Sequence, residues 1–219
     1  MIYDPDAGED AKELILEGET LMSMTVPHVS FRHFFVVIFI ATCLGSLVGC
    51  AGTGDVFRDT TMDFGSIKTV AVLPFANLSR DQLAGERVRD AFNTMLMASG
   101  AVYAVPVGEV ARGIAAAGMA NPTTPSADEV TKIAKSIKVD AVISGVVREY
   151  GDVRSGTSSA DVISLSLQMM EGQTGRIVWS TGTTQGGISL MDRLFGGGGK
   201  PLNDITEKAV NALINKLFE

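Results

Sequence analysis

Histidine and cysteine are scarce in this chain of 219 residues, and their positions exclude several kinds of chemistry. The two histidines, His28 and His33, and the two cysteines, Cys43 and Cys50, all lie within the first 50 residues. If the chain is cut before Cys50, the remaining protein has no histidine and one cysteine. Ser-His-Asp and Cys-His catalysis, zinc-finger sites and structural disulfides are then excluded.

An excess of charge of one sign is also lacking outside the amino-terminal segment. The whole chain has 18 Lys and Arg against 25 Asp and Glu, a net charge of −7. Residues 1–49 hold seven of the acids and two of the bases, which leaves 18 acids and 16 bases in residues 50–219, a net charge of −2. A nearly neutral body does not bind polyanions by bulk charge. The hydrophobic fraction of 46% indicates a chain that can bury a core.

An uncharged run of 16 residues, 34–49, follows a basic flank. A spanning helix usually needs ~20 apolar residues, and this run ends in small residues, so it predicts a cleaved secretory signal. Its last residues match the bacterial lipobox, Leu47-Val48-Gly49-Cys50. We therefore expect Cys50 to carry a covalent lipid, the only cofactor predicted. The alternative is an inner-membrane anchor helix with an incidental cysteine.

The residue after Cys50 is Ala51, whereas an Asp there commonly retains bacterial lipoproteins in the inner membrane. By that resemblance we expect a lipid anchor in the outer membrane and a domain on its periplasmic face. Residues 1–23, with a net charge of −6, do not fit a signal peptide. We expect translation to begin at Met22 or Met24; the alternative is an acidic extension that is removed with the signal.

The remaining chain divides into a lipidated tether, residues 50–65, and a single α/β domain, residues 66–219. Apolar patterns predict strands at 67–75, 102–105, 141–147, 162–169 and 176–183. They predict helices at 82–99, 107–117, 126–137 and 203–218. The third helix begins at a capping box formed by Ser126 and Glu129. This order predicts a mixed sheet of about five strands covered by helices.

Three stretches together resemble a group of periplasmic lipoproteins: residues 70–77, residues 139–147, and the hairpin 165–183 around Gly172-Gln173-Thr174-Gly175. Their domain is similar to the amino-terminal domain of TolB. The group includes the curli-secretion lipoprotein of the CsgG type, PelC-type export lipoproteins and the penicillin-binding-protein activators. The resemblance covers residues 66–217 and implies a fold, because strand and turn motifs do not define a site.

We expect a protein that is not an enzyme, because the spacing of its acidic residues does not bring carboxylates together, and that works with an envelope protein partner or as a homo-oligomer. Our leading hypothesis is an assembly or accessory factor of an envelope export or secretion system. The alternatives are an activator of a peptidoglycan synthase and, third, a subunit of an export pore. A pore needs extra amphipathic hairpins of about ten residues per strand, and segments 152–160 and 186–201 are too polar or too rich in glycine to provide them.

No pattern of residues predicts a catalytic, metal or small-molecule site. Asp128, Glu129 and Asp140 do not form an evident carboxylate pair, and the charged residues of 148–154 are typical of a solvated loop. The segment 186–201 pairs a glycine run with four apolar residues, Leu190, Met191, Leu194 and Phe195. These four are either core or an exposed anchor, and they are the candidate partner loop.

Overall fold

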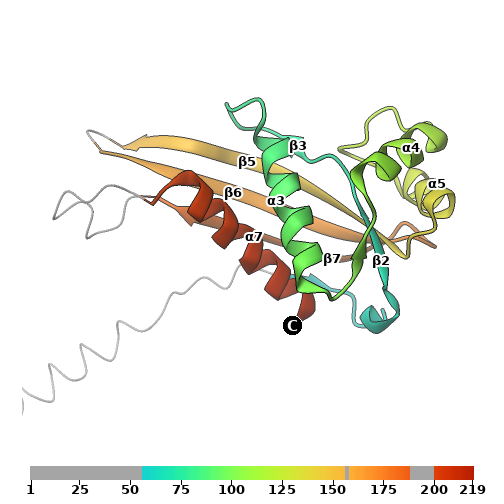
Figure 1. Ribbon diagram of the computed structural model, residues 1–219. Coiled ribbons are helices and arrows are strands. Elements are labelled where there is room, and N and C mark those ends of the chain that lie inside the picture. Colours follow the sequence, from blue (N-terminus) through green and yellow to red (C-terminus); the bar gives the residue numbers. More distant parts are fainter. Residues whose placement is uncertain (1–55, 156–157, 188–199) are drawn as a thin grey trace, which may run out of the picture. The chain divides into compact units, whose positions relative to one another are not determined.

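The computed structural model describes residues 56–155, 158–187 and 200–219. They form one mixed sheet of seven strands with four α-helices, which confirms the predicted α/β class (Figure 1). The strand order is β1-β7-β6-β5-β2-β4, and β3 also pairs with β5. The pairs β5–β6, β6–β7 and β1–β7 are antiparallel, whereas β2, β3 and β4 join in parallel.

The elements follow the predicted order, with two short strands added. The strands are β1 (Val56–Arg58), β2 (Thr69–Val72), β3 (Ala76–Asn77), β4 (Tyr103–Ala104), β5 (Ala141–Ser155), β6 (Ser158–Glu171) and β7 (Ile177–Gly186). The helices are α3 (Ala84–Ser99), α4 (Val107–Ala117), α5 (Ala127–Ile137) and α7 (Leu202–Phe218), with a 3₁₀ turn at Phe64–Ser66. In the described residues, no helix is both long and apolar enough to cross a membrane.

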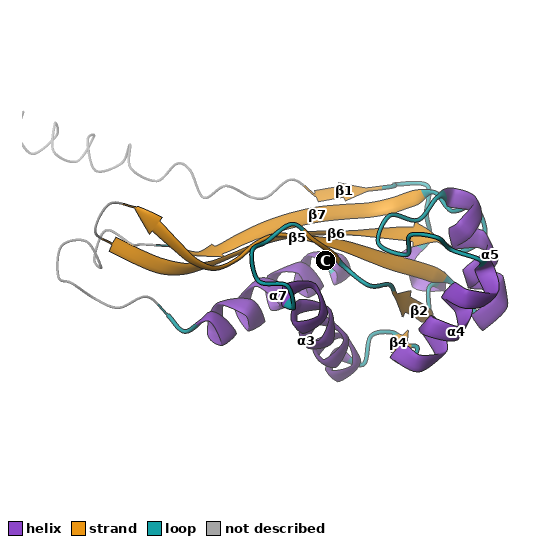
Figure 2. Cartoon of the chain, turned by 90° about the horizontal axis from the view of Figure 1, so that it is seen from above, coloured by secondary structure: helices purple, strands orange, loops and turns teal. Residues whose placement is uncertain are grey.

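Helices α3 and α7 cover one face of the sheet (Figure 2). The alternating apolar residues of β6, predicted to face a core, lie here: Ile163, Leu165, Leu167 and Met169. The Trp179 side chain on β7 is fully buried among them. This face therefore contains the main core of the domain.

Helices α4 and α5 cover the opposite face at one end of the sheet, where they form a second core with Leu73, Val142 and Met170. The capping box predicted for α5 is present, because Ser126 and Glu129 hydrogen-bond to each other's backbone N–H groups. Strand β2 is buried on both faces, since its residues alternate between the two cores. A buried parallel strand of this kind reads as a continuous apolar run.

The turn between β6 and β7 lies directly against α5. A Cβ atom at Gly172 would lie 2.8 Å from the Cβ of Ala134, and one at Gly175 would lie 2.3 Å from the carbonyl oxygen of Ala127. Gly175 also has a φ of +69°, which favours glycine. The two glycines of the Gly-Gln-Thr-Gly motif are thus required by close packing along both ends of one helix.

Two segments differ from the sequence prediction. Residues 56–58 were expected in the tether, but they form β1 and pair with the edge of β7. The charged residues of 148–154 were interpreted as a solvated loop; their side chains are exposed as expected, but the assignment to a loop was wrong. They belong to β5, which continues to Ser155 because it pairs with β6 along its whole length.

Candidate docking surface

The site residues named from the sequence lie outside the described part of the chain. This holds for Cys50 and the lipobox residues Leu47, Val48 and Gly49, and for the candidate partner loop Leu190, Met191, Leu194 and Phe195. Their roles remain predictions.

Two of the acidic residues considered in the sequence analysis, Asp140 and Glu129, accept hydrogen bonds from nearby backbone groups. The Asp140 carboxylate accepts hydrogen bonds from the backbone N–H groups of Lys68 and Thr69 and from the Thr69 hydroxyl, each at 2.9 Å. Partial burial raises the pKa of Asp140, but these hydrogen bonds outweigh it, so its pKa lies below the ordinary value. The pKa of Glu129 is lowered chiefly by the hydrogen bond from the Ser126 backbone. Within the described residues, no three His, Cys, Asp or Glu side chains are grouped as a metal site.

A groove of about 890 Å³ lies between the β3–α3 loop and the outer half of β5. The loop contributes residues 78–81, and β5 contributes residues 148–152 and Arg154. Successive residues of a strand point to opposite faces of the sheet. A groove lined by consecutive residues of β5 therefore runs along the edge of that strand, not across one face.

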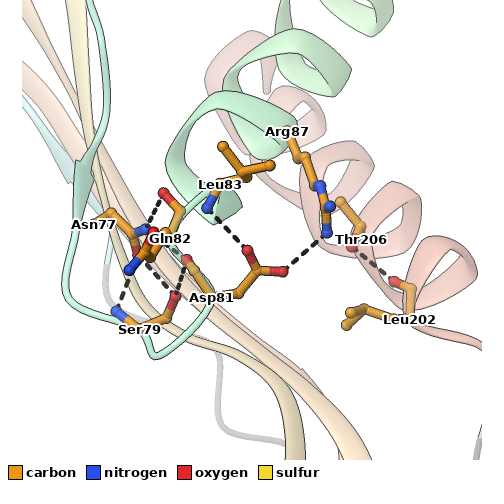
Figure 3. Close-up of polar contacts among 8 residues, drawn as sticks. All are labelled: Asn77, Ser79, Asp81, Gln82, Leu83, Arg87, Leu202 and Thr206. Atoms are coloured by element: carbon orange, nitrogen blue, oxygen red, sulfur yellow. Dashed lines mark hydrogen bonds and ion pairs between the residues drawn. The ribbon is translucent and has the colours of Figure 1, made fainter.

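Hydrogen bonds from Asn77 hold the loop wall of this groove (Figure 3). The Asn77 side-chain amide donates to the carbonyl oxygens of Asp81 and Gln82, at 2.7 and 3.2 Å. Its oxygen accepts from the backbone N–H of Ser79 at 3.0 Å and from the Ser79 hydroxyl at 2.7 Å. The chain therefore turns at Asn77-Leu78-Ser79, and one side chain closes the turn.

Asp81 joins the same loop to the start of α3. One oxygen of its carboxylate accepts from the backbone N–H of Leu83 at 2.9 Å, and the other pairs with Arg87 at 2.9 Å (Figure 3). At Gly85, in the first turn of α3, a Cβ atom would lie 2.9 Å from the carbonyl oxygen of Phe75. The helix therefore packs directly on the backbone that leads into β3. The loop has a defined shape without bound ligand.

This loop presents apolar side chains to the outside. Leu78 is 70% exposed and Leu83 is 51% exposed. A leucine that is held outward by a hydrogen-bonded turn loses little conformational freedom when it is buried against a partner. The sequence analysis missed this feature. The sequence pattern that indicates it is an apolar residue, Leu78, between the polar turn residues Asn77 and Ser79.

Several charged groups in the groove have no ion-pair partner among the described residues. Asp81 pairs with Arg87, and Asp152 pairs with Arg154 at 3.3 Å, but no ion pair includes Arg80, Arg148 or Glu149. Two of these three groups are arginines, so the unpaired charge favours an acidic partner. Arginine is also enriched at protein interfaces.

A shallower pocket of about 230 Å³ lies on the sheet face opposite α3 and α7. Its lining is mostly small and hydroxylated, with Ser144, Ser166 and Ser180 from the sheet and Thr123 and Thr124 from the α4–α5 loop. The Gln168 amide donates to the Ser144 hydroxyl at 2.9 Å, which satisfies both groups within the sheet. This pocket presents neither an unpaired charge nor an exposed apolar anchor.

Fold and surface together give a helix-covered mixed sheet with a groove at one strand edge. The family model described as "Peptidoglycan-synthase activator LpoB" matches residues 54–184 of this chain. The chain belongs to this family.

Several solved bacterial structures are similar to this chain. Lipoprotein GNA1162 from Neisseria meningitidis is 19% identical with a TM-score of 0.51, and the match covers 69% of this chain and 98% of that one. A PelC dodecamer from Paraburkholderia phytofirmans is 17% identical with a TM-score of 0.50, over 75% and 96% of the two chains. The LpoB C-terminal domain from Salmonella enterica is 17% identical with a TM-score of 0.44, over 58% and 87%. No protein of the curated set matches.

These findings bear on the expected resemblance. The family match supports the expected resemblance to the synthase activators, and the PelC structure supports the expected fold. The wider grouping with the curli-secretion lipoprotein and TolB stays a prediction. Since the GNA1162 and PelC structures are at most 19% identical to this chain, they support the fold alone.

Proposed function

We propose that this chain is a lipid-anchored activator of a peptidoglycan synthase, a binding partner that is not itself an enzyme. The observation that carries the proposal is the family match over residues 54–184, which spans the sheet from before β1 into β7. The sequence analysis placed this function second, behind an assembly factor for export. The family assignment reverses that order.

The export hypothesis has weaker support. It rests on the likeness to PelC, and a likeness at 17% identity with a TM-score of 0.50 concerns the fold. The same fold carries unrelated functions in other proteins. The dodecamer of that protein therefore does not by itself assign an oligomeric state to this chain.

The proposed location is the periplasmic face of the outer membrane, with Cys50 as the anchor. Because β1 begins at Val56, five residues separate Cys50 from the sheet. Such a segment spans at most about 20 Å when fully extended. We therefore expect the synthase to meet this domain close to the membrane.

An activator without catalytic groups works by binding. It raises the activity of the synthase only if it binds the active conformation more tightly than the inactive one. The groove beside β5 fits this role, since hydrogen bonds within the chain at Asn77 define its loop wall. A surface that is already ordered loses less conformational entropy when a partner binds, so more of the interaction energy contributes to affinity.

The test is reconstitution of the full chain with each peptidoglycan synthase of the same bacterium. The rate of glycan-strand polymerisation from the lipid-linked precursor should rise with at least one synthase, and the two proteins should bind. The double variant Leu78→Asp, Leu83→Asp should lose this effect while keeping its fold, because both side chains are exposed. If no synthase binds or responds, the proposed function is wrong.

A further inference from the structure

The outer half of β5 has an open edge. On one side, β5 pairs with β6 from Ala141 to Ser155. On the other side, β2 pairs with residues 141–143 and β3 pairs with Val146 and Val147. The last backbone hydrogen bond on that side runs from the Leu78 N–H to the Val147 carbonyl oxygen, at 2.8 Å. Beyond this bond, no strand in the described part of the chain pairs with this side of β5.

The open edge is long enough to bind another strand. Residues 149–154 extend for about 20 Å at ~3.3 Å per residue, which is the usual length of a strand. An edge of this length presents backbone N–H and C=O groups that pair with any suitable extended chain. The groove of about 890 Å³ follows this edge, and the Leu78–Asp81 loop forms its other wall.

The same edge carries features that limit indiscriminate pairing. The register shifts between Val147 and Glu149, and Gly151 has a φ of +112°. Charged side chains follow one another along it at Arg148, Glu149, Asp152 and Arg154. Bulges and charges of this kind are how natural sheets keep open edges from aggregating. They leave the edge available to a partner whose charges match.

We propose that the synthase binds here by adding a strand to the outer edge of β5, alongside residues 149–154. This inference rests on the proposed function and specifies its interface. The added segment is extended, with one apolar side chain that packs on Leu78 and an acidic side chain that pairs with Arg80 or Arg148. Backbone pairing supplies affinity in such complexes, and the side chains supply specificity.

The charges favour an acidic segment of another protein over a second copy of the chain. Of the three groups without an ion pair, Arg80 and Arg148 are cations and Glu149 is an anion, so a second copy would bring an excess of positive charge to the shared interface. An acidic segment of another protein neutralises this excess. The exposed Leu78 then becomes the buried centre of the contact, surrounded by charged groups.

Hydrogen–deuterium exchange of the full chain in detergent, with and without the periplasmic part of the synthase, tests the binding mode. Backbone amides within residues 149–154 that point away from β6 should exchange at least about tenfold more slowly in the complex, because strand pairing protects them. Residues 131–137 of α5, on another part of the domain, serve as the internal reference.

A charge-reversal pair tests the specificity. The variant Arg80→Glu, Arg148→Glu should weaken binding of the synthase about tenfold or more. The matched control, Lys132→Glu, Lys135→Glu on α5, makes the same change in net charge and should leave binding unchanged. Both variants should keep the circular dichroism spectrum and melting temperature of the parent chain.

The possible results distinguish the binding mode, strand addition to β5, from the proposed function as a synthase activator. Binding without protection of residues 149–154, or equal loss in the two charge variants, overturns strand addition and leaves the synthase-activator function standing. Protection that depends on protein concentration without synthase identifies a second copy as the occupant and also overturns it. Failure of every synthase to bind overturns the proposed function and this inference together.

Discussion

The guanidinium of Arg58 donates a hydrogen bond of 2.8 Å to the carbonyl oxygen of Leu217, 159 positions away in the chain. A second bond of 3.3 Å reaches the carbonyl oxygen of Lys216. Arg58 belongs to β1, and the two carbonyls are in the last turn of α7. The first strand after the proposed lipid anchor is thereby joined to the last helix. A cation near a helix carboxyl terminus also interacts favourably with the helix dipole.

Replacing Arg58 by Met should lower the free energy of unfolding by about 1–2 kcal/mol, since hydrogen bonds to charged groups contribute this order and the site is partly open to solvent. Arg58→Lys should recover part of the loss, because lysine keeps the charge but not the planar pair of donors. Urea denaturation measures both. A stability of Arg58→Met equal to that of the parent chain would show that the contact contributes nothing.

Gly175→Ala should destabilise the domain more than Gly118→Ala. Both glycines have a left-handed backbone, with φ of +69° and +65°, but only a Cβ at Gly175 meets the backbone of Ala127. The Gly118 change should cost about 1 kcal/mol for the backbone conformation alone. The Gly175 change should cost about 1–3 kcal/mol more, for the overpacking against α5. Equal losses in thermal or urea unfolding would contradict the packing argument.

Asp140 should make stability depend on acid. Its pKa in the folded state lies below its ordinary value of 3.8, so its contribution is fully present above that pH. The contribution is lost as the pH falls through the folded-state pKa. The free energy of unfolding of Asp140→Asn should therefore fall below that of the parent chain at pH ~6 and approach it at pH ~3.

Asp59 and Glu129 qualify the expected size of this effect. The pKa of Asp59 is lowered mainly by the Thr61 hydroxyl, and that of Glu129 mainly by the Ser126 backbone. Both groups lose stabilising contacts over the same acid range. Asp140→Asn should thus reduce the pH dependence without abolishing it, and an unchanged profile would exclude a role for Asp140.

Cys50→Ala should leave an uncleaved or soluble protein, because the lipobox needs a thiol at its last position. Membrane fractionation and the mass of the processed chain measure this. Normal processing together with normal membrane pelleting of the variant would rule out Cys50 as the anchor.

The candidate partner loop has its own test. If Leu194 and Phe195 dock a partner, Leu194→Asp with Phe195→Asp should abolish function and keep the melting temperature within about one or two degrees, since exposed substitutions cost little. If they are core, the same change buries two charges and unfolds the domain. A folded and fully active variant would contradict both interpretations.

The helices and the buried strands could be predicted well from local patterns. Val107–Ala117 was predicted to the residue, and Ser126 marked the start of α5, because a capping box satisfies its own backbone groups locally. The apolar residues at alternate positions of β6, Ile163, Leu165, Leu167 and Met169, lie in the main core. These features depend on residues that lie close together in the sequence.

The groove could not be predicted in the same way. Residues 148–154 contain charged side chains and a glycine, a composition that is unfavourable for strands and typical of loops. They form a strand because β6 pairs with residues 149–154, past the register shift at Arg148, and β1 forms in the same way by pairing with β7. Long-range pairing overrides local propensity in such segments.

The sequence by itself determined the α/β class, the order of the main elements and the lipobox that defines the proposed anchor, since each depends on residues that are close together in the chain. Only the tertiary structure decided which edge of the sheet remains open. That edge depends on where β3 stops beside β5, and on an Asn77 network that turns Leu78 outward from the last backbone bond. The contacts between β3 and β5 join segments that are far apart in the sequence, so no local sequence pattern predicts them.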